Sequence, residues 1–498
     1  MAPSLSKAAT GDPGNRTFFG HPSGLATLFL TEMWERFSFY GMRALLVLYL
    51  TAEVADGGLA MKAATATALY SVYNATVYLL ALPGGWFGDR LWGPRKTVAI
   101  AGGIIMTGHF LLAVPVEASF FIGLVFIAAG SGLLKSNIST MVGHLYDGPQ
   151  DPRRDGGFTI FYMGINIGAF LAPLTIGTVG QEVNWHLGFA MAGVGMALGL
   201  LQFLLGTKHL SAKSSMVPSP LSAEERARAF KWTAVGVAVT AVFYGTLALA
   251  NAFSIDWVLW PLSIAGIVLP GMYFVRIHRD PEVTAEEHRK MNGFLWFFIA
   301  AAIFWMIFDQ SGSTMTVFAK DSTSSTLFGM DFPESWYQSL NPLYVMAFAP
   351  IVAMIWVKLR SRNPSTTVKF GMGLVGVGAS FGIMMLAMAA ASGGERVTPL
   401  WLVTAYLVQT LAELCLSPVG LSVSTKLAPE KYASQVMGLW FLAVTAGDCV
   451  AAIQQLVLGD EIVGSAAYFG SQGAIAVVAG IAFLIYRRKV IRLMGDVP

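Results

Sequence analysis

Charged residues occur in this chain where an apolar helix would cross a lipid bilayer. The apolar run from Leu25 to Leu50 would form a helix about 39 Å long, which exceeds the ~30 Å hydrocarbon core. Its interior carries Glu32, Glu35, Arg36 and Arg43. At about 100° per residue, these side chains and Tyr40 fall on one face of the helix. The run therefore predicts a charged stripe on an otherwise apolar cylinder.

This stripe is too costly to face lipid. Each ionised group at mid-depth would cost at least ~2.5–3.5 kcal/mol there, so four of them would cost on the order of 10 kcal/mol. An interfacial amphipathic helix, or side chains reaching outward from a helix end, is the alternative interpretation. The cost favours a stripe that faces the protein interior or a water-filled cavity.

Three further charges lie in other apolar runs, namely Lys135, Asp309 and Glu413. Together with the stripe they make four carboxyl groups and three bases. When all are ionised this leaves a net negative charge, which a dry cavity tolerates poorly. A carboxyl that changes partners as the cavity changes state also changes its affinity for a proton, which is what proton coupling requires. The bases suit a substrate carboxylate and Glu413 suits an ammonium, so a zwitterion with separated charges would fit both.

Several polar and aromatic residues in apolar runs are weaker candidates. Tyr162 and Asn166 are four residues apart on one helix face, where they serve either a pathway or interhelical hydrogen bonds. Asn341 precedes a proline and is either a cap or a ligand. Trp305 and Trp440 either shape a pocket or pack against neighbours. For His109 and Asp448 a satisfied core role is the expectation.

Composition places these residues in a polytopic membrane protein. The chain has 498 residues, of which 55% are hydrophobic and 12% charged, whereas soluble domains carry about 25% charged residues. The net charge of +3 gives no reason to propose nucleic acid as a partner. Cys415 and Cys449 lie in apolar runs and read as core residues. We expect no metal site and no cofactor.

Apolar runs recur at a spacing that fits membrane helices. We expect fourteen of them, at 24–50, 67–88, 96–115, 118–142, 156–180, 186–206, 228–250, 255–277, 292–319, 335–359, 367–391, 398–426, 432–458 and 464–487. Polar linkers group them as six, two and six, and many transporters consist of such halves around a midplane site. The expected units are a tail 1–23, a bundle 24–207, a linker 208–227, a hairpin 228–277, a linker 278–291, a bundle 292–488 and a tail 489–498.

Loop charges predict the orientation of this all-α fold. An even number of spans puts both termini on one side, and the loops on the other side contain only Lys62, Lys320 and Arg396 as basic residues. The positive-inside rule then places both termini in the cytoplasm. Residues 1–23 are polar, so we expect no cleaved signal peptide and a first apolar run that stays in the membrane.

Four segments resemble a known family. Gly84 to Lys96 looks like the loop motif of the major facilitator superfamily, with glycines for close packing. The Glu-x-x-Glu-Arg-Phe-x-x-Tyr pattern at 32–40 resembles the signature of proton-dependent oligopeptide transporters, as do residues 132–137 and 158–170. The six-two-six layout is similar to that of the bacterial members. The resemblance implies a major facilitator fold, alternating access, and di- and tripeptides as substrates carried with protons.

The resemblance also implies a role for individual residues. Arg36 and Lys135 would hold the peptide carboxylate, and Asn166, Asn341 and Glu413 its amino terminus. Tyr40, Tyr78 and Tyr162 would contact the peptide, while Trp305, Ser417 and Trp440 would line side-chain pockets. Glu32 and Glu35 would couple protons, with Glu35 exchanging partners with Lys135. Arg43 and Asp309 would bridge the halves, and both Asp309 and Glu413 would share in coupling.

Two positions depart from the commonest family pattern. Phe39 stands where many members have Tyr, which removes a hydroxyl, and Asp309 stands where Glu is frequent, which shortens the bridge to Arg43 by one methylene. A carrier of another small anion or zwitterion, such as nitrate or an amino acid, is the rival function within transporters. A membrane-bound enzyme and a channel are rivals from other classes. We expect a monomer in lipid of the bacterial inner membrane, without covalent chemistry.

Overall fold

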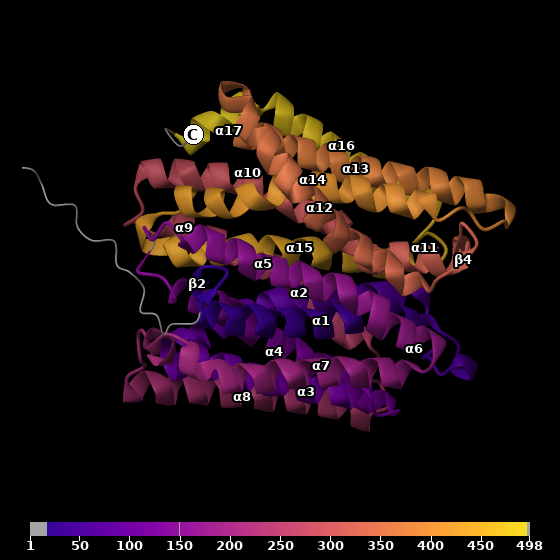
Figure 1. Ribbon diagram of the computed structural model, residues 1–498, viewed down its shortest axis with the longest axis horizontal. Coiled ribbons are helices and arrows are strands. Elements are labelled where there is room, and N and C mark those ends of the chain that lie inside the picture. Colours follow the sequence, from indigo (N-terminus) through magenta and orange to yellow (C-terminus); the bar gives the residue numbers. More distant parts are fainter. Residues whose placement is uncertain (1–16, 149, 496–498) are drawn as a thin grey trace, which may run out of the picture.

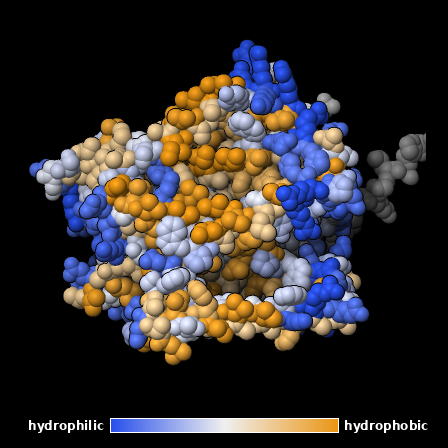
Figure 2. Space-filling model, turned by 180° about the vertical axis from the view of Figure 1, so that it is seen from behind, coloured by the Kyte–Doolittle hydropathy of each residue, from blue (hydrophilic) through white to orange (hydrophobic). Residues whose placement is uncertain are grey.

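The computed structural model describes residues 17–148 and 150–495, except for the side chains of residues 417–419, 421, 422, 425, 433 and 434. It is a bundle of long, nearly parallel helices in two halves, one above the other in Figure 1. The described residues begin and end at the same end of the bundle (Figure 1). Figure 2 shows an apolar surface band between hydrophilic ends, as expected for a protein that spans a bilayer.

The first half contains seven helices. They are α1 (Gly24–Thr51), α2 (Ala63–Phe87), α3 (Pro94–Leu112), α4 (Glu117–Gly143), α5 (Arg154–Ala172), α6 (Thr178–Glu182) and α7 (Trp185–Gly206). A five-residue π turn, η3 (Pro173–Gly177), joins α5 to α6, so the expected run 156–180 is not one regular helix. Pro173 lacks the N–H that a regular helix would use at this point.

The second half follows a hairpin of two helices. The hairpin is α8 (Ala223–Leu249) and α9 (Asp256–Arg279), and the half contains α10 (Ala285–Phe308), α11 (Thr314–Ser322), α12 (Leu340–Leu359), α13 (Thr366–Ala390), α14 (Leu400–Leu427), α15 (Ala433–Leu458) and α16 (Ala466–Ile485). The 3₁₀ turns η6 (Asp309–Gly312) and η7 (Glu334–Ser339) precede α11 and α12. A short amphipathic helix, α17 (Arg487–Met494), follows α16.

Short elements complete the structure. Two-residue strands form antiparallel pairs, β1 (Thr17–Phe18) with β2 (His21–Pro22) and β3 (Thr326–Leu327) with β4 (Met330–Asp331). Further helical turns are η1 (Val54–Asp56), η2 (Gly88–Trp92), η4 (Thr207–His209), η5 (Ala212–Ser215), η8 (Arg360–Arg362), η9 (Ala391–Gly393) and η10 (Glu430–Tyr432).

Each of the expected apolar runs contains a helix, but two helices begin inside segments expected as linkers. Ser222 caps α8 and Thr284 caps α10, and each forms a reciprocal capping box with a glutamate three residues on. Among the described residues, ten helical segments are long and apolar enough by themselves to cross a membrane. The count of fourteen spans and the division into units stay predictions.

The halves meet through related helices. α2 of the first half packs on α15 of the second, and α5 of the first half packs on α12 of the second. Each half has its own apolar core. Each half is thus packed around its own core, and the two halves meet along these helix pairs.

The hairpin is asymmetric. α9 packs on both α2 and α15, with Leu259 in the core of the first half and Phe274 in the core of the second. No residue of α8 is buried, in contrast. α9 therefore belongs to the protein interior, and α8 presents its sides to the surroundings.

Candidate functional site

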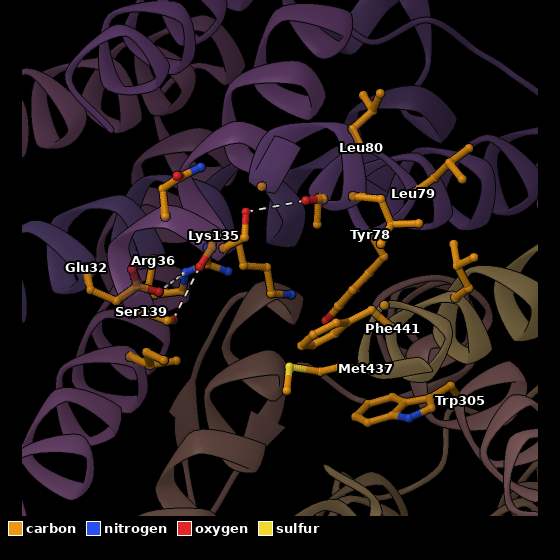
Figure 3. A pocket seen from close by; sticks show the side chains of 18 of the residues that line it. Glu32, Arg36, Tyr78, Leu79, Leu80, Lys135, Ser139, Trp305, Met437 and Phe441 are labelled. Carbon is orange, nitrogen blue, oxygen red and sulfur yellow. Dashed lines mark hydrogen bonds and ion pairs between the residues drawn. The ribbon is translucent and has the colours of Figure 1, made fainter. Parts of the chain in front are cut away.

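A cavity of about 1700 Å³ lies between the halves. It extends from Arg43 and Asp309, near the middle of the molecule, to Asp89, Arg90 and Arg276 at the end where the termini lie. Of the residues expected to form the site, those on its wall are Glu32, Arg36, Tyr40, Arg43, Tyr78, Lys135, Tyr162, Asn166, Trp305, Asp309, Asn341 and Glu413. Figure 3 shows Glu32 and Arg36 on one side and Trp305 on the other.

The α1 stripe forms a compact ion cluster. Arg36 Nε lies 3.0 Å from Glu32 Oε1 and 2.5 Å from Glu35 Oε2, and Glu35 Oε1 accepts a hydrogen bond of 3.2 Å from the Ser131 hydroxyl. Glu35 is fully buried behind Arg36. Two carboxylates thus share one guanidinium, whose Nη2 has no hydrogen-bond partner among the described residues.

Lys135 stands apart from this cluster. Its Nζ lies 3.5 Å from the centroid of the Tyr78 ring, a cation–π arrangement, whereas Glu35 is paired with Arg36. The expected exchange of Glu35 between Arg36 and Lys135 concerns a change of state, so it stays a prediction. In this state the ammonium faces the cavity.

The opposite wall carries the carboxyl of Glu413. Asn341 Nδ2 donates to Glu413 Oε2 and to Thr410 Oγ1, both at 3.0 Å. The buried Trp305 Nε1 has no hydrogen-bond partner within the described part of the chain. A pair of cations on the first half therefore faces a carboxyl on the second across the cavity.

Arg43 joins the halves at the inner end of the cavity. Its Nη2 lies 3.0 Å from Asp309 Oδ1, and its Nε donates to the Tyr70 hydroxyl. The shorter Asp309 side chain therefore still reaches Arg43. Arg43 is 9% exposed and Asp309 is 6% exposed, so this is a buried ion pair.

Two expected pocket residues are placed differently. Trp440 is 7% exposed and packs on Phe370 and against Gly420, so it lies in the core of the second half and is not on the cavity wall. Its helix turns Met437 and Phe441 to the cavity instead. The side chain of Ser417 lies outside the described residues.

Tyr406 and Asn74 did not stand out in the sequence. Tyr406 lines the cavity and its hydroxyl donates to the Ser311 carbonyl at 2.9 Å. Asp448, expected as a core residue, accepts a 2.7 Å hydrogen bond from Asn74 Nδ2 across the halves. Asn74 and Asp448 each had one signal in the sequence, namely that a polar residue stands alone in an apolar run. His109 is fully buried and has no partner among the described residues.

Beyond Arg43 the halves are closed by a series of hydrogen bonds at the end away from the termini. Gln181 Nε2 donates to Glu334 Oε2 at 2.5 Å, and the Ser335 N–H donates to Gln181 Oε1 at 2.9 Å. Trp336 Nε1 donates to Thr178 Oγ1 at 2.8 Å. Further contacts of this kind join Ser339 to Phe170, Lys320 to Thr51 and Ala64 to Asp460. We call these contacts, together with the Arg43–Asp309 pair, the closed junction.

No metal site accompanies the cavity within residues 17–148 and 150–495, where no group of His, Cys, Asp or Glu is placed to hold an ion. The chemistry that the site offers is recognition and proton exchange by carboxyls, bases and aromatic rings. It offers two cations, an opposed carboxyl and a cluster in which carboxylates and a substrate would compete for one guanidinium.

Comparison with known proteins identifies relatives along almost the whole chain. The Di-/tripeptide transporter of Lactococcus lactis subsp. cremoris is 43% identical over 97% of this chain and 98% of its own. The Uncharacterized transporter YclF of Bacillus subtilis is 44% identical over 96% of both chains. The Peptide transporter YePEPT of Yersinia enterocolitica is 38% identical over 90% of both.

Solved structures show the same fold. A crystal structure of a variant of peptide transporter POT in complex with alafosfalin superposes with a TM-score of 0.91 at 43% identity, over 97% of this chain and 98% of that one. A POT family transporter in complex with 5-aminolevulinic acid gives 0.91 at 34% identity, over 96% and 98%. The POT family profile matches residues 95–462. This chain is an integral membrane transporter that belongs to the POT family.

Proposed function

We propose that this protein is a symporter that takes up di- and tripeptides with protons by alternating access of its two halves. The single observation that carries the proposal is the division of charge across the cavity. Arg36 and Lys135 lie on the wall of the first half, and Glu413 lies on the wall of the second. A peptide has a carboxylate and an ammonium at opposite ends, which matches this division. The names of the relatives support the same substrate class.

Arg36 and Lys135 are suited to bind a substrate carboxylate. Arg36 has a buried nitrogen, Nη2, that lacks a hydrogen bond within the described chain, and Lys135 rests on the Tyr78 ring. A substrate carboxylate between them would form charge-assisted hydrogen bonds, which are the strong ones. Glu413, held by Asn341, would take the ammonium together with Asn166. Tyr40, Tyr162 and Trp305 would contact the middle of the peptide.

Proton coupling follows from competition for Arg36. Glu32 and Glu35 share this guanidinium now, so a substrate carboxylate that binds Arg36 weakens their pairing. A buried carboxylate that loses its partner either takes up a proton or finds another base. Lys135 is the other base with which Glu35 would pair. Peptide binding and protonation are thereby linked, and the Arg43–Asp309 bridge and Glu413 complete the set of groups that respond.

The setting of this activity follows from the loop charges. Both termini would lie in the cytoplasm of a bacterium, so the cavity would be accessible from the cytoplasm in this state and closed toward the outside. We propose a monomer in the inner membrane whose transport needs no cofactor and no covalent step.

Uptake of labelled dialanine into proteoliposomes, with and without an inward proton gradient, tests the proposal. We expect accumulation only with the gradient. Competition by other dipeptides, by amino acids and by nitrate identifies the substrate class. No accumulation under the gradient, or inhibition by nitrate alone, would overturn it.

Two variants separate binding from coupling. Glu35→Gln should lose gradient-driven accumulation and keep some peptide exchange. Arg36→Ala or Lys135→Ala should bind dialanine more weakly, while C-terminally amidated dialanine, which already lacks the carboxylate, should lose little further affinity. Equal affinity of the wild type for free and amidated dialanine would contradict the assigned carboxylate site.

A further inference from the structure

The contact between α2 and α15 is polar on the side of the closed junction. Asn74 Nδ2 donates to Asp448 Oδ2 at 2.7 Å, the Ser71 hydroxyl donates to Gln455 Oε1 at 3.2 Å, and the Thr445 hydroxyl donates to the Ala75 carbonyl at 3.1 Å. These groups are buried and belong to different halves. We call this set the α2–α15 seam, and it has to separate whenever the cavity opens to the other side.

Asp448 is the member of this seam that can change its charge. It is 1% exposed, and its partner Asn74 is also 1% exposed. An amide or a hydroxyl would satisfy the same donor without ever being ionised, and the neighbouring pairs of the seam use such groups. The function described so far gives no reason for a carboxyl at this position.

The charged groups close to Asp448 are already paired with each other. The charged groups near the Asp448 carboxyl are Asp309 from η6 and Arg43 from α1. The Tyr70 hydroxyl from α2 contacts Arg43. Arg43 is already engaged by Asp309 and Tyr70. Two carboxylates with one guanidinium would leave a net negative charge away from water, which is costly unless a proton removes it.

The remaining neighbours of Asp448 do not alter this balance. On its own helix the adjacent titratable group is Cys449, whose thiol points to the Leu262 carbonyl of α9. α9, α10 and α14 also pack on α15. α9 carries its charged residues at its two ends, at Asp256 and from Arg276 onward, and α10 carries them in its first turns, from Glu286 to Lys290. α14 carries Glu413, which is hydrogen-bonded to Asn341, and Lys426 near its end. The charge on Asp448 is therefore set by Asp309, by Arg43 and by whether water reaches the seam.

We propose that Asp448 is a further proton-binding residue of the transport cycle, which holds a proton while the α2–α15 seam is closed and releases it when the seam opens to water. Asp448 acts through the seam and through the Arg43–Asp309 pair, so it positions the halves and does not touch substrate. The inference rests on the proposed function in so far as transport requires the junction to open and close.

Distance measurements between spin labels on the outer surface test this inference without substrate. Val54 of the first half and Phe328 of the second are exposed label sites at the closed end. The parent is a Cys415→Ala, Cys449→Ala chain that retains peptide counterflow, in nanodiscs. For each variant, the logarithm of the closed-to-open ratio is plotted against pH between 5 and 9.

A proton bound only by the closed form makes that ratio fall by up to tenfold per pH unit. In Asp448→Asn the slope should therefore decrease by about one proton relative to the parent. Ser71→Ala, the matched control, loses a hydrogen bond of the same seam but no titratable group. It should shift the ratio equally at every pH and leave the slope unchanged.

An unchanged slope in Asp448→Asn would overturn the inference, as would a changed slope in Ser71→Ala. Should Asp448→Asn fail to fold, Asp448→Ser supplies a small neutral hydroxyl at the same place, and the same loss of slope is expected. Dialanine uptake by the parent is measured in parallel. Absent uptake with a reduced slope would contradict the proposed function alone, and normal uptake with an unchanged slope would contradict this inference alone.

Discussion

The two ends of the molecule hold the halves in different ways. At the closed junction the halves bind each other directly, through Arg43 and Asp309 and through the hydrogen bonds around Gln181. At the end with the termini, the polar linkers bind each half separately. Arg90 of the first half pairs with Glu225 in the first turn of α8, directly after one linker, and Lys431 of the second half pairs with Asp280 of the other linker.

This difference indicates which contacts change during a transport cycle. Contacts between halves must break for the cavity to face the other side, whereas contacts within a half together with its own linker can persist. Substitutions at the closed junction should therefore change the balance of states, and those at the linkers should not. Four predictions test this contrast, from the largest expected effect to the smallest.

Arg43→Ala should have the largest effect. It leaves the buried Asp309 carboxyl without its cation, and breaking a buried pair in this way costs about 3–5 kcal/mol. The closed junction should lose a hundredfold or more in population, and gradient-driven dialanine uptake should be lost. Arg43→Ala with Asp309→Asn removes the unpaired charge and should recover part of the closed state in the spin-label assay. Equal populations in the single and double variants would contradict the contribution of the ion pair.

Gly177→Ala should have the next largest effect. A Cβ at this position of η3 would lie 2.4 Å from Ser335 Oγ and 2.7 Å from its Cβ, so the halves would have to move apart, at about 1–3 kcal/mol. Gly438→Ala is the matched control at the other end, because its Cβ would meet only the flexible tip of Leu82 at 2.5 Å. The spin-label distances should lengthen in the first variant and stay unchanged in the second. Similar shifts in both would remove the contrast between the ends.

Gln181→Ala should weaken the closed junction moderately. It removes the hydrogen bonds to Glu334 and to the Ser335 N–H, each of which contributes about 0.5–1.5 kcal/mol. The closed-to-open ratio should fall by roughly one order of magnitude, while dialanine affinity in the open cavity stays the same. A loss of affinity measured by equilibrium binding would show that the side chain acts on the site as well.

Lys431→Ala should have the smallest effect on transport. The Lys431 ammonium, which hydrogen-bonds Asp280 at 2.7 Å, lowers the pKa of that carboxyl, and the Tyr432 hydroxyl adds to this shift. A lowered pKa means that the contact stabilises the linker above the ordinary Asp value of about 4 and is lost only as the pH falls through the lowered value. The ratio of variant to wild-type uptake should therefore be close to one and constant between pH 5 and 8. A ratio that changes over this range would show that the linker takes part in the cycle.

The parts that could be predicted from the sequence are those where a wrong placement would cost much free energy. A charge in an apolar run is costly, so Arg36, Lys135 and Glu413 could be assigned to a cavity before the structure placed them on its walls. The helix starts at Ser222 and Thr284 also had a local signal, the Ser/Thr-x-x-Glu pattern. Both lie in polar segments, which were expected to be linkers for that reason.

Orientation and pairing could not be predicted in the same way. α15 has only a weak polar face, formed by Thr445, Asp448 and Gln455, and that face alone did not fix the rotation of the helix well enough to assign Trp440 to the core and Phe441 to the cavity. The pairing of Asn74 with Asp448 joins residues more than 370 positions apart, and nothing local specifies it. The sequence also does not specify which base Glu35 pairs with in this structure, where its partner is Arg36.

The size of the cavity has a consequence for selectivity. At about 1700 Å³ it exceeds the roughly 300–1,000 Å³ of a pocket that encloses a small ligand tightly. A dipeptide fixed at its two ends would leave room for many water molecules, so its side chains would stay largely hydrated. Hydrated side chains lose little solvation on binding and contribute little to affinity. In the proposed mode of binding, which uses the two termini that all peptides share, the protein should therefore accept peptides of very different sequence at similar strength.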